Sequence, residues 1–491
     1  MTQNATRSGW AAAAFLMPAV VAATVMLALA ICLRPLLMTN AGIIVLALFL
    51  LLLIGGSIFR SRRDLLAMPV LFSFAYLGYP IGALFYALGW DPPVEDIPTF
   101  VRLGENRIYL LLAILLACGG YLALWAGYHL GMRDRKPSED DIFPKIQGDE
   151  ILRGRLLLAV LALSLTGLAA VSLIVMQRGG IANYIQTQAA SRTTAAGSFY
   201  LNEIALFLPL ASLLWLGLDF RRAKKSPLFW IIFSLGFGYL LLTSTRWNII
   251  GFLFVVTAIG YQNGVLTKKK SAVLLGILLA IIVVIGKARQ ISSRGGLINA
   301  TTMAESMGRN LDARGLLYLT VAGRNFTDID LLAYILKEYS WTELAWGRTF
   351  ADIPLMVLPR AFWASKPKEI GVAVFQKYSG WEGVPIAWHP GFLGELYINF
   401  HVPGALAGLF VLGLLLAKAD RWRLSGPAKS PRQLLYLILG VEFVIKGFVT
   451  GFMIPGIQAL MYLLPLWVAL KIVVRPGQPG RPSRDSAERP A

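Results

Sequence analysis

Residues 41–58, AGIIVLALFLLLLIGGSI, form an unbroken apolar stretch that contains no charged side chain. A helix that crosses the hydrocarbon core of a bilayer needs about 20 mostly apolar residues. The stretch therefore predicts a membrane-spanning helix. The rest of the chain agrees, because 56% of its 491 residues are hydrophobic and its mean hydropathy is +0.63. A soluble globular protein does not bury so much apolar surface.

Comparable stretches recur along the chain and predict an all-α, polytopic membrane protein. We expect about twelve spans, at residues 10–33, 41–58, 66–88, 108–130, 156–176, 199–218, 228–243, 248–266, 271–286, 391–417, 433–451 and 454–474. The first stretch lacks the short apolar region and clean cleavage site of a signal peptide, so we expect it to remain as an anchor.

The basic residues give the expected orientation of these helices. A net charge of +19 would raise the question of nucleic-acid binding in a soluble protein, but here the charges cluster at alternate connections. The clusters are Arg60, Arg62 and Arg63; Arg133, Arg135, Lys136, Arg153 and Arg155; Arg221, Arg222, Lys224 and Lys225; Lys268 to Lys270; Arg421, Arg423, Lys429 and Arg432; and the tail after Lys471. The positive-inside rule places these connections and both termini in the cytoplasm, and no nucleic acid is expected as a partner.

The same alternation divides the chain into four parts. Residues 1–286 hold the earlier transmembrane helices, 287–390 form a large extracytoplasmic loop, 391–474 hold the last transmembrane helices, and 475–491 form a disordered cytoplasmic tail. A long loop escapes the positive-inside rule, so its own basic residues do not contradict the assignment. Its Trp, Phe and Leu content predicts short helices that lie on or dip into the membrane. Chemistry is expected where this loop meets the outer helix ends.

Cofactor and metal motifs give little support to other enzyme classes. The two cysteines, Cys32 and Cys118, fall within or beside apolar stretches and imply no disulfide framework or thiolate metal site. Asp328-Ile-Asp330 spells a D-x-D motif of metal-dependent sugar-nucleotide transferases, but it is short and lies on the side without nucleotide sugars. The chain has no Walker loop, dinucleotide fingerprint, H-E-x-x-H or G-x-S-x-G motif. We expect no metal and no cofactor.

Basic residues near the outer surface are candidate phosphate ligands. Arg246 stands in Thr243-Ser-Thr-Arg-Trp-Asn248, a tight turn between two apolar stretches. We expect the guanidinium of Arg246 at the outer headgroup layer, where its planar set of N–H donors can bind a diphosphate through two hydrogen bonds. The alternative is that Arg246 only marks a helix end, with its side chain snorkelling to the membrane surface. Lys287, Arg289 and Arg294 follow the stretch 271–286 and either neutralise lipid phosphates or form a solvated basic edge.

Two residues are candidate general bases. Glu395 lies near the start of the expected helix 391–417, with Asn399 one turn further along the same face. Partial desolvation there would suit Glu395 to accept a proton, and a structural strut bonded to a neighbouring Arg is the alternative. His389 lies just before this helix, and a neutral imidazole can act as a base near physiological pH, although loop histidines are often bystanders.

Other polar residues within the apolar stretches have structural interpretations. Glu442 and Lys446 are placed on one face of helix 433–451 in the order that favours an ion pair, and we expect this pair to be structural. Glu203 lies near the outer end of the expected span 199–218 and is a weaker candidate among the polar residues at the outer helix ends. His401 with Pro403 predicts a kink in the helix that starts at residue 391.

A set of residues in the second half resembles a known family. The set comprises Leu358-Pro-Arg360, Trp363, Lys366-Pro367, Gly371, His389-Pro-Gly391, Gly394-Glu-Leu-Tyr-Ile-Asn-Phe400 and Gly404, with Arg246 as the basic residue between two earlier helices. These residues resemble the oligosaccharide repeat unit polymerases, the Wzy-type O-antigen polymerases of bacteria, over residues 200–415. Members of the family usually have Gly after Asn-Phe, whereas this chain has His401. The departure concerns the shape of the helix more than its role. The N-terminal helices are similar to the family only in hydropathy.

The resemblance implies a GT-C-like, metal-independent glycosyltransferase in the bacterial cytoplasmic (inner) membrane, with its active site on the extracytoplasmic side. Its donor and acceptor would both be undecaprenyl-diphosphate-linked oligosaccharides, and a chain-length regulator membrane protein is a possible partner. The residues implied to bind diphosphate are Arg246, Arg289, Arg294, Arg360 and Lys366. Either Glu395 or His389 would take the proton from the acceptor hydroxyl.

Three other functions are compatible with parts of this pattern. An O-antigen ligase uses the same donor and also has a large outer loop. A cell-wall glycan polymerase of the shape, elongation and division class shares the lipid diphosphate but usually has fewer spans. A flippase or transporter would place ionisable residues along the bundle interior, whereas here they gather at the outer helix ends, which disfavours transport.

Overall fold

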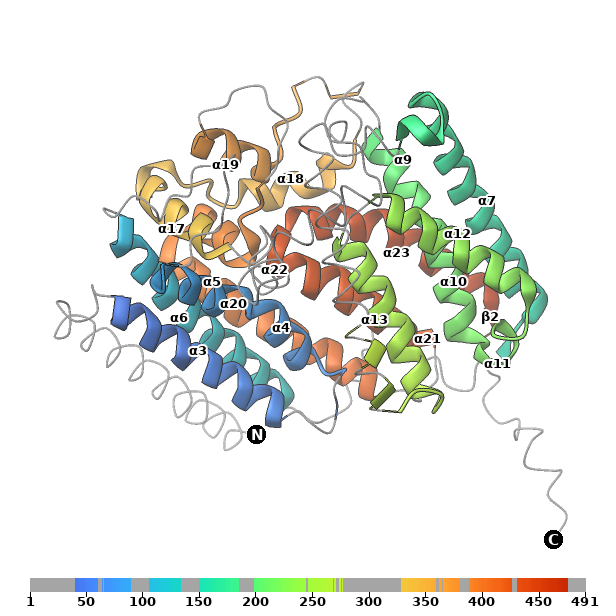
Figure 1. Ribbon diagram of the computed structural model, residues 1–491, viewed down its shortest axis with the longest axis horizontal. Helices are drawn as coiled ribbons and strands as arrows, with labels where there is room; N and C mark the ends of the chain where they lie inside the picture. Colours follow the sequence, from blue (N-terminus) through green and yellow to red (C-terminus); the bar gives the residue numbers. More distant parts are fainter. Residues whose placement is uncertain are drawn as a thin grey trace, which may run out of the picture.

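The described part of the chain is almost entirely helical (Figure 1). The computed structural model describes residues 40–60, 64, 66–89, 106–133, 150–184, 198–243, 246–267, 269–270, 273–274, 276, 328–358, 362–363, 365–379, 388–425 and 431–475. The expected span 10–33, most of 271–286, and the tail from residue 476 lie outside these residues.

The helices follow one another with short connections within each described range. They are α3 (Asn40–Arg60), α4 (Met68–Tyr76), α5 (Gly78–Ala87), α6 (Arg107–Arg133), α7 (Arg153–Gln177), α9 (Ser198–Ala205), α10 (Phe207–Leu218), α11 (Phe220–Ala223), α12 (Pro227–Thr243), α13 (Arg246–Gln262), α17 (Asp328–Glu338), η4 (Trp341–Glu343), α18 (Arg348–Met356), α19 (Ile370–Ser379), α20 (Gly391–Leu424), α21 (Pro431–Leu439), η5 (Gly440–Ile445), α22 (Lys446–Thr450) and α23 (Met453–Val473). Two short strands, β1 (Glu150–Ile151) and β2 (Val474–Arg475), pair antiparallel.

The helices confirm the expected class of membrane protein. Within the described residues, seven helical stretches are long and apolar enough to cross a membrane, namely Asn40–Phe59, Met68–Ala87, Arg107–Arg133, Arg153–Gln177, Tyr200–Leu218, Gly391–Leu424 and Met453–Val473. The expected spans 228–243 and 248–266 correspond to the shorter apolar helices Pro227–Thr243 and Asn248–Gln262. The expected span 433–451 is divided among α21, a π-helical segment η5, and α22.

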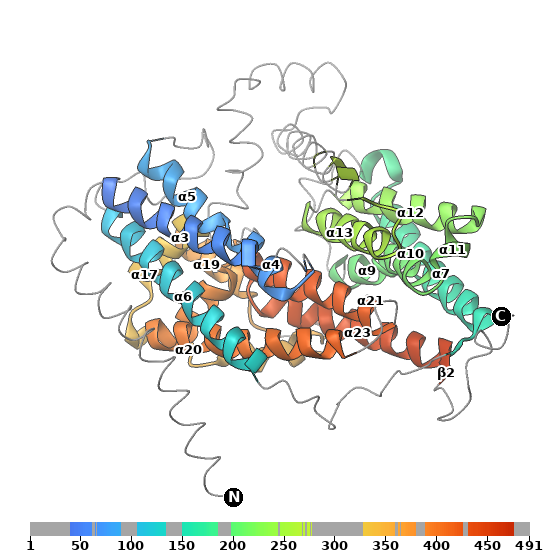
Figure 2. The same cartoon turned by 90° about the horizontal axis from the view of Figure 1, so that it is seen from below.

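The helices form two groups that are joined by the C-terminal helices (Figures 1 and 2). In the first group α3, α4, α5 and α6 pack with α20, and in the second α7, α9, α10, α12 and α13 pack together. α23 contacts α7, and η5 contacts both α4 and α13. The C-terminal helices therefore link the two groups.

The bundle has two chemically different ends. The helices α17, α18 and α19 come from the expected outer loop and cover one end, which we call the loop end (Figure 1). Contacts of α17 with α5, α6 and α20, and of α18 with α20 and α23, attach them there. The opposite end, which we call the basic end, holds β1 and β2 and the C-terminus of α20 with Arg421 and Arg423. Among the described residues of the segment 287–390, α17, α18 and α19 are short helices.

A buried carboxylate ties the helices together at the basic end. Asp420 is only 1% exposed and accepts hydrogen bonds from Tyr128 Oη at 2.6 Å, from the Met68 amide at 3.0 Å and from Tyr436 Oη. Arg423 Nε lies 3.4 Å from the same carboxylate. A buried charge is tolerated only when it is paired and hydrogen-bonded, so this cluster fixes α4, α6, α20 and α21 to one another.

Close backbone contact joins α6 to α20. A Cβ atom added at Gly127 would overlap the carbonyl oxygen of Phe410, and one added at Gly413 would overlap that of Leu124. In membranes, small residues at helix interfaces allow backbones to approach closely and gain van der Waals contact. The two glycines therefore set the spacing of this helix pair. The predicted kink in α20 is confirmed at His401, where φ is 59° and ψ is −164°.

We predict that Gly413→Ala destabilises the protein, because the added methyl group forces α6 and α20 apart at a cost of about 1–3 kcal/mol. Thermal unfolding of the detergent-purified protein, followed as loss of the folded peak in size-exclusion chromatography, should show a lower midpoint. Gly238→Ala in α12 is the matched control, because no atom lies within 4 Å of its added Cβ. Equal midpoints for the two variants would contradict the prediction.

Candidate functional site

The carboxylate of Glu395 lies at the centre of a polar cluster beneath the loop end. Glu395 is 0% exposed. Thr349 Oγ1 donates a hydrogen bond to its Oε1 at 2.9 Å, and the amides of Phe452 and Met453 donate to its Oε2, the second at 3.4 Å. These amides open α23, so the negative charge also meets the positive end of that helix dipole. Glu395 therefore joins α18, α20 and α23 and makes no described contact with an arginine.

Asn399 extends this cluster by one turn of α20. It is also 0% exposed, and its Nδ2 donates to Thr349 Oγ1 at 2.7 Å while its Oδ1 accepts from the Gly347 amide at 2.9 Å. The Ala345 amide donates to the carbonyl of Ile398 at 2.9 Å. The expected shared face of Glu395 and Asn399 is confirmed, because both side chains hold Thr349. The segment before α18 is thereby fixed along α20.

Two glycines leave the space that this cluster needs. Gly451 has φ 84°, and a Cβ there would overlap Glu395 Oε2. Gly391 has φ 64°, and a Cβ there would stand 2.5 Å from the carbonyl oxygen of Phe448. Left-handed backbone is easy for glycine and strained for other residues. The backbone conformation therefore favours glycine at both positions. At Gly451 the closeness of the Glu395 carboxylate also requires it, and at Gly391 the closeness of the Phe448 carbonyl does.

His389 faces a carboxylate that lies far from it in the sequence. His389 Nδ1 lies 2.9 Å from Glu369 Oε1 in the connection that precedes α19. The two side chains are 23% and 27% exposed, so they lie at the edge of the cluster and reach solvent. The imidazole lies against Gly371, where any Cβ would overlap the ring, and the Trp388 amide donates to the Gly371 carbonyl at 2.9 Å. The fold therefore holds the ring with one nitrogen toward Glu369.

The charges around His389 favour its protonated form. Burial alone would lower the pKa of the imidazole, but the Glu369 carboxylate raises it, with a further contribution from Glu395, and the net result is a pKa above the ordinary value. A raised pKa makes the neutral ring a stronger proton acceptor. The ion pair of protonated His389 with Glu369 therefore adds to the free energy of unfolding. This contribution is complete below the ordinary histidine pKa and is lost as the pH rises through the raised pKa.

Of the expected phosphate ligands, the structure describes the surroundings of Lys366. Its Nζ donates to the carbonyls of Met356 at 2.6 Å and Leu358 at 3.0 Å, and to Tyr200 Oη at 3.3 Å. Lys366 therefore caps the C-terminus of α18. Arg246 is the first residue of α13, and its side chain lies outside the described residues, as do Arg289, Arg294 and Arg360.

The D-x-D motif lies at the start of α17 with its second aspartate turned inward. Asp330 is 0% exposed, and Tyr378 Oη donates to its Oδ2 at 3.4 Å. The side chain of Asp328 lies outside the described residues. Among the residues that the structure describes, no three His, Cys, Asp or Glu side chains come together as a possible metal site.

The remaining polar residues singled out in the sequence contact the C-terminal helices. Glu442 and Lys446 form the expected ion pair, across the junction of η5 and α22. Glu203 accepts a hydrogen bond from Gln458 Nε2 at 3.2 Å. The interhelical contact of Glu203 joins α9 to α23 rather than to the cluster around Glu395.

These features define an almost entirely helical membrane protein with a buried polar cluster under the segment that covers its loop end. No protein-family model, curated protein or solved structure matches the chain. The arrangement of its own residues is therefore the basis for a functional assignment.

Sequence reasoning missed three members of the site. Glu369, Thr349 and Gly451 come from three separate segments, and no periodicity links them to His389 or Glu395. The only available signal was that Glu369 stands between Lys366-Pro367 and Gly371, within the residues that carry the family resemblance.

Proposed function

We propose that the chain is a polymerase that joins undecaprenyl-diphosphate-linked oligosaccharide repeat units into a surface polysaccharide on the outer face of a bacterial cytoplasmic membrane. The observation that carries the proposal is the convergence of the residues that resemble the Wzy-type polymerases. Gly371 lies against His389, while Glu395 and Asn399 bind Thr349 in the adjoining cluster. Residues that are distant in sequence thus form one polar site at the loop end.

The proposed reaction transfers the growing glycan from its lipid diphosphate to a hydroxyl of the next lipid-linked repeat unit. The hydroxyl oxygen forms a bond to the anomeric carbon, and the bond from that carbon to the diphosphate oxygen breaks. His389 accepts the hydroxyl proton through Nε2, because Nδ1 faces Glu369. The diphosphate leaves with the electron pair, and basic side chains stabilise its charge. This chemistry requires no metal ion or cofactor.

Of the two candidate bases, the geometry favours His389. A general base must come within hydrogen-bond reach of the proton that it takes. The His389 side chain is 23% exposed, whereas the Glu395 carboxylate is enclosed and already accepts hydrogen bonds from Thr349 and α23. We assign Glu395 the role of a positioning residue that holds the cluster against α18 and α23.

We assign diphosphate binding to the basic residues that the sequence predicts at the outer surface. Arg246 is the first residue of α13 and is expected at the outer surface, and Arg289, Arg294 and Arg360 belong to the segment expected outside. Lys366 contributes to diphosphate binding indirectly, because it holds the end of α18 through backbone carbonyls.

Deletion of the gene from the source bacterium tests the proposal. Loss of the polymerase should collapse the long ladder of surface glycan on a gel to a core that carries one repeat unit. Loss of every capped species, including the single repeat, would identify an O-antigen ligase instead. An unchanged ladder would reject both functions.

The His389–Glu369 pair predicts a specific pH dependence. Because the base acts in its neutral form, the initial rate should increase as the pH rises through the raised pKa of His389. Glu369→Gln removes the charge that raises this pKa, so the acidic limb of the rate profile should move to lower pH and the plateau rate should fall. Glu343→Gln is the control, since Glu343 pairs with Lys377 at 3.0 Å on the surface. An acidic limb that does not move would contradict the role of Glu369.

A further inference from the structure

The ring of Trp341 lies on the surface of the loop end with one of its faces covered by another ring. Trp341 belongs to η4, which lies between α17 and α18 in the chain. Its indole stacks on the imidazole of His401, with ring centroids 4.2 Å apart and an interplanar angle of 20°, yet Trp341 is 54% exposed. Because His401 covers one face, the exposed area includes the opposite face of the indole.

The backbone at His401 has a conformation that favours glycine. Its φ is 59° and its ψ is −164°. Within the described ranges, His401 and Trp346, with φ 49°, are the two residues other than glycine that have a positive φ. The Trp346 amide donates to the carbonyl of Asn399 at 3.1 Å, so the two strained residues lie close to the same turn of α20. Strain of this kind costs free energy and is concentrated at functional sites.

The imidazole of His401 is held in place from a second side. Tyr397 Oη and His401 Nε2 share a hydrogen bond of 3.0 Å, and Tyr397 is only 3% exposed. A glycine at position 401 would give the same backbone without strain, so the kink in α20 does not need an imidazole. The side chain of His401 therefore acts as a fixed support beneath Trp341.

The residues on either side of Trp341 in the chain carry hydroxyl groups. Ser340 and Thr342 are exposed, and their hydroxyl oxygens lie 2.8 Å apart. A sugar ring has a face of C–H groups that stacks on an indole and a rim of hydroxyls that bind polar neighbours. An acyl chain would cover the same indole but would offer these hydroxyls no partner. The surroundings of Trp341 therefore suit a sugar better than the hydrocarbon of a lipid.

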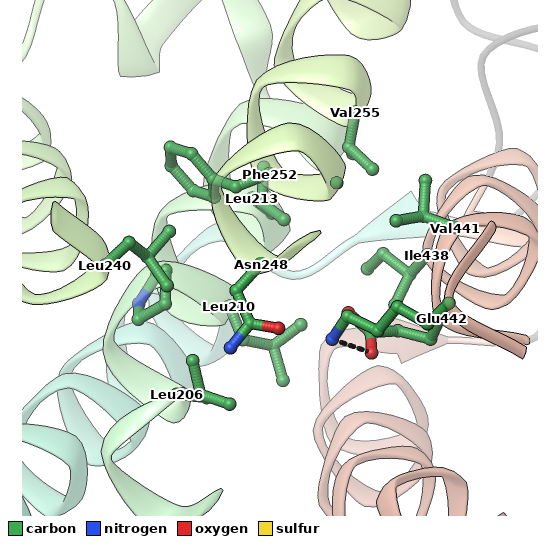
Figure 3. Close-up of a pocket in the computed structure, with 13 residues that line it drawn as sticks. Leu206, Leu210, Leu213, Leu240, Asn248, Phe252, Val255, Ile438, Val441 and Glu442 are labelled. Carbon is green, nitrogen blue, oxygen red and sulfur yellow. Dashed lines mark hydrogen bonds and ion pairs between the residues drawn. The ribbon is translucent and has the colours of Figure 1, made fainter. Parts of the chain in front are cut away.

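The cavity between the two helix groups is a poorer place for a sugar. It holds about 60 Å³, which is room for a few water molecules. Apolar side chains such as Leu213, Phe252 and Val255 line much of it (Figure 3). A sugar ring there would lose its hydrogen bonds to water without replacing most of them.

Trp341 is joined to the buried cluster of Glu395 by the segment that follows η4. The Gly347 amide donates to Asn399 Oδ1 at 2.9 Å, and Thr349 Oγ1 donates to Glu395 Oε1 at 2.9 Å. The segment from Trp341 to Thr349 is thus fixed along α20, the helix that begins beside His389. A ligand on Trp341 would therefore lie on the same surface as the proposed reaction.

We propose that Trp341, supported by His401, binds a sugar ring of the oligosaccharide repeat unit. This inference rests on the proposed polymerase function and names a subsite of that same site. His401 lies about 15 Å along α20 from Gly391, the second residue after His389, and this distance exceeds the width of one sugar ring. The bound sugar is therefore a unit other than the one that reacts at His389. His401 is a positioning residue, because it holds Trp341 and does not itself touch the sugar.

Titration of the purified protein with a free glycan tests the proposal. The probe is the repeat-unit oligosaccharide of the source bacterium, cleaved from its lipid, and saturation-transfer NMR in detergent follows its binding. We expect Trp341→Ala to weaken binding about tenfold and Trp341→Phe, which keeps an aromatic face, to stay within about threefold of the wild type. Trp230→Ala in α12 is the matched control, because Trp230 is 51% exposed and should not affect binding.

His401→Gly separates support of Trp341 from a structural role. The variant should bind the oligosaccharide about threefold more weakly, because the indole loses the ring beneath it. Its thermal unfolding midpoint should stay at or above that of the wild type, because glycine relieves the strain in the backbone. A lower midpoint with unchanged binding would show that the His401 ring serves the fold alone and would overturn its role.

The free oligosaccharide distinguishes failure of this inference from failure of the polymerase function. Equal binding by the wild type and Trp341→Ala, or no binding by either, would overturn the inference even if the wild type makes a normal glycan ladder; equal binding would leave lipid headgroups as the occupant of the ring. Binding that depends on Trp341 in a protein that makes no ladder would support the sugar subsite and reject the polymerase.

Discussion

Replacing His389 with alanine is expected to reduce glycan polymerisation by roughly 10²- to 10⁴-fold, which is the range for removal of a general base. His389 is partly exposed and already paired with Glu369 through Nδ1, so its loss removes the proton acceptor without opening the buried cluster. The surface glycan of cells carrying His389→Ala should show the core with one repeat. Immunoblots of the membrane fraction should show wild-type amounts of the variant.

His129→Ala is the matched control for this experiment. His129 stacks on Trp125 with ring centroids 4.6 Å apart in α6, and it has no role in the proposed reaction. We expect a normal ladder from this variant. A normal ladder from His389→Ala at equal protein levels would exclude His389 as the base.

Replacing Glu395 with alanine is expected to cause the largest loss of folding stability, about 3–5 kcal/mol. Hydrogen bonds to a charged group contribute about 1.5–3 kcal/mol each, and their loss leaves buried donors unsatisfied. The orphaned donors are the Thr349 hydroxyl and the first amides of α23. The lost contacts join three helices, so the attachment of α18 to α20 and α23 should weaken.

Glu395→Gln separates a positioning role from a catalytic one. The amide keeps an oxygen for the α23 amides and nearly the same shape, so we expect the folded fraction to approach that of the wild type and polymerisation to persist within about tenfold. Thermal unfolding in detergent and the glycan ladder measure the two effects. Glu343→Ala, at a surface position, controls for loss of a carboxylate. A stable Glu395→Gln protein without polymerase activity would transfer the role of base from His389 to Glu395.

The apolar stretches predicted most of the described helices because lipid imposes a strong constraint on sequence. A spanning segment must be long, apolar and hydrogen-bonded within itself, and residues 41–58 or 108–130 satisfy this condition without help from the rest of the chain. The kink at His401 and the Glu442–Lys446 pair were also predictable, because each depends on neighbours within one helix. The division of 433–451 by a π-helical segment was not, since no residue type there marks an extra residue in the turn.

The polar cluster was only partly predictable because its partners come from distant segments. The sequence identified Glu395 and His389 as candidate bases near a helix start, with a strut bonded to a neighbouring arginine as the structural alternative for Glu395. Among the described residues, the hydrogen-bond partners of Glu395 are Thr349 and the amides at the start of α23. Lys366 was predicted to bind diphosphate, and its described contacts are with backbone carbonyls of α18 and with Tyr200. Such pairings follow from tertiary packing, which no local pattern encodes.

Polymerisation by the purified protein tests the central claim most directly. The protein is reconstituted into liposomes, given undecaprenyl-diphosphate-linked repeat units of the source bacterium, and the products are separated by size. We predict that the wild type extends the repeat units into a ladder and releases undecaprenyl diphosphate, whereas His389→Ala yields no ladder. Absence of a ladder from the folded wild-type protein, or an equal ladder from both proteins, would contradict the account.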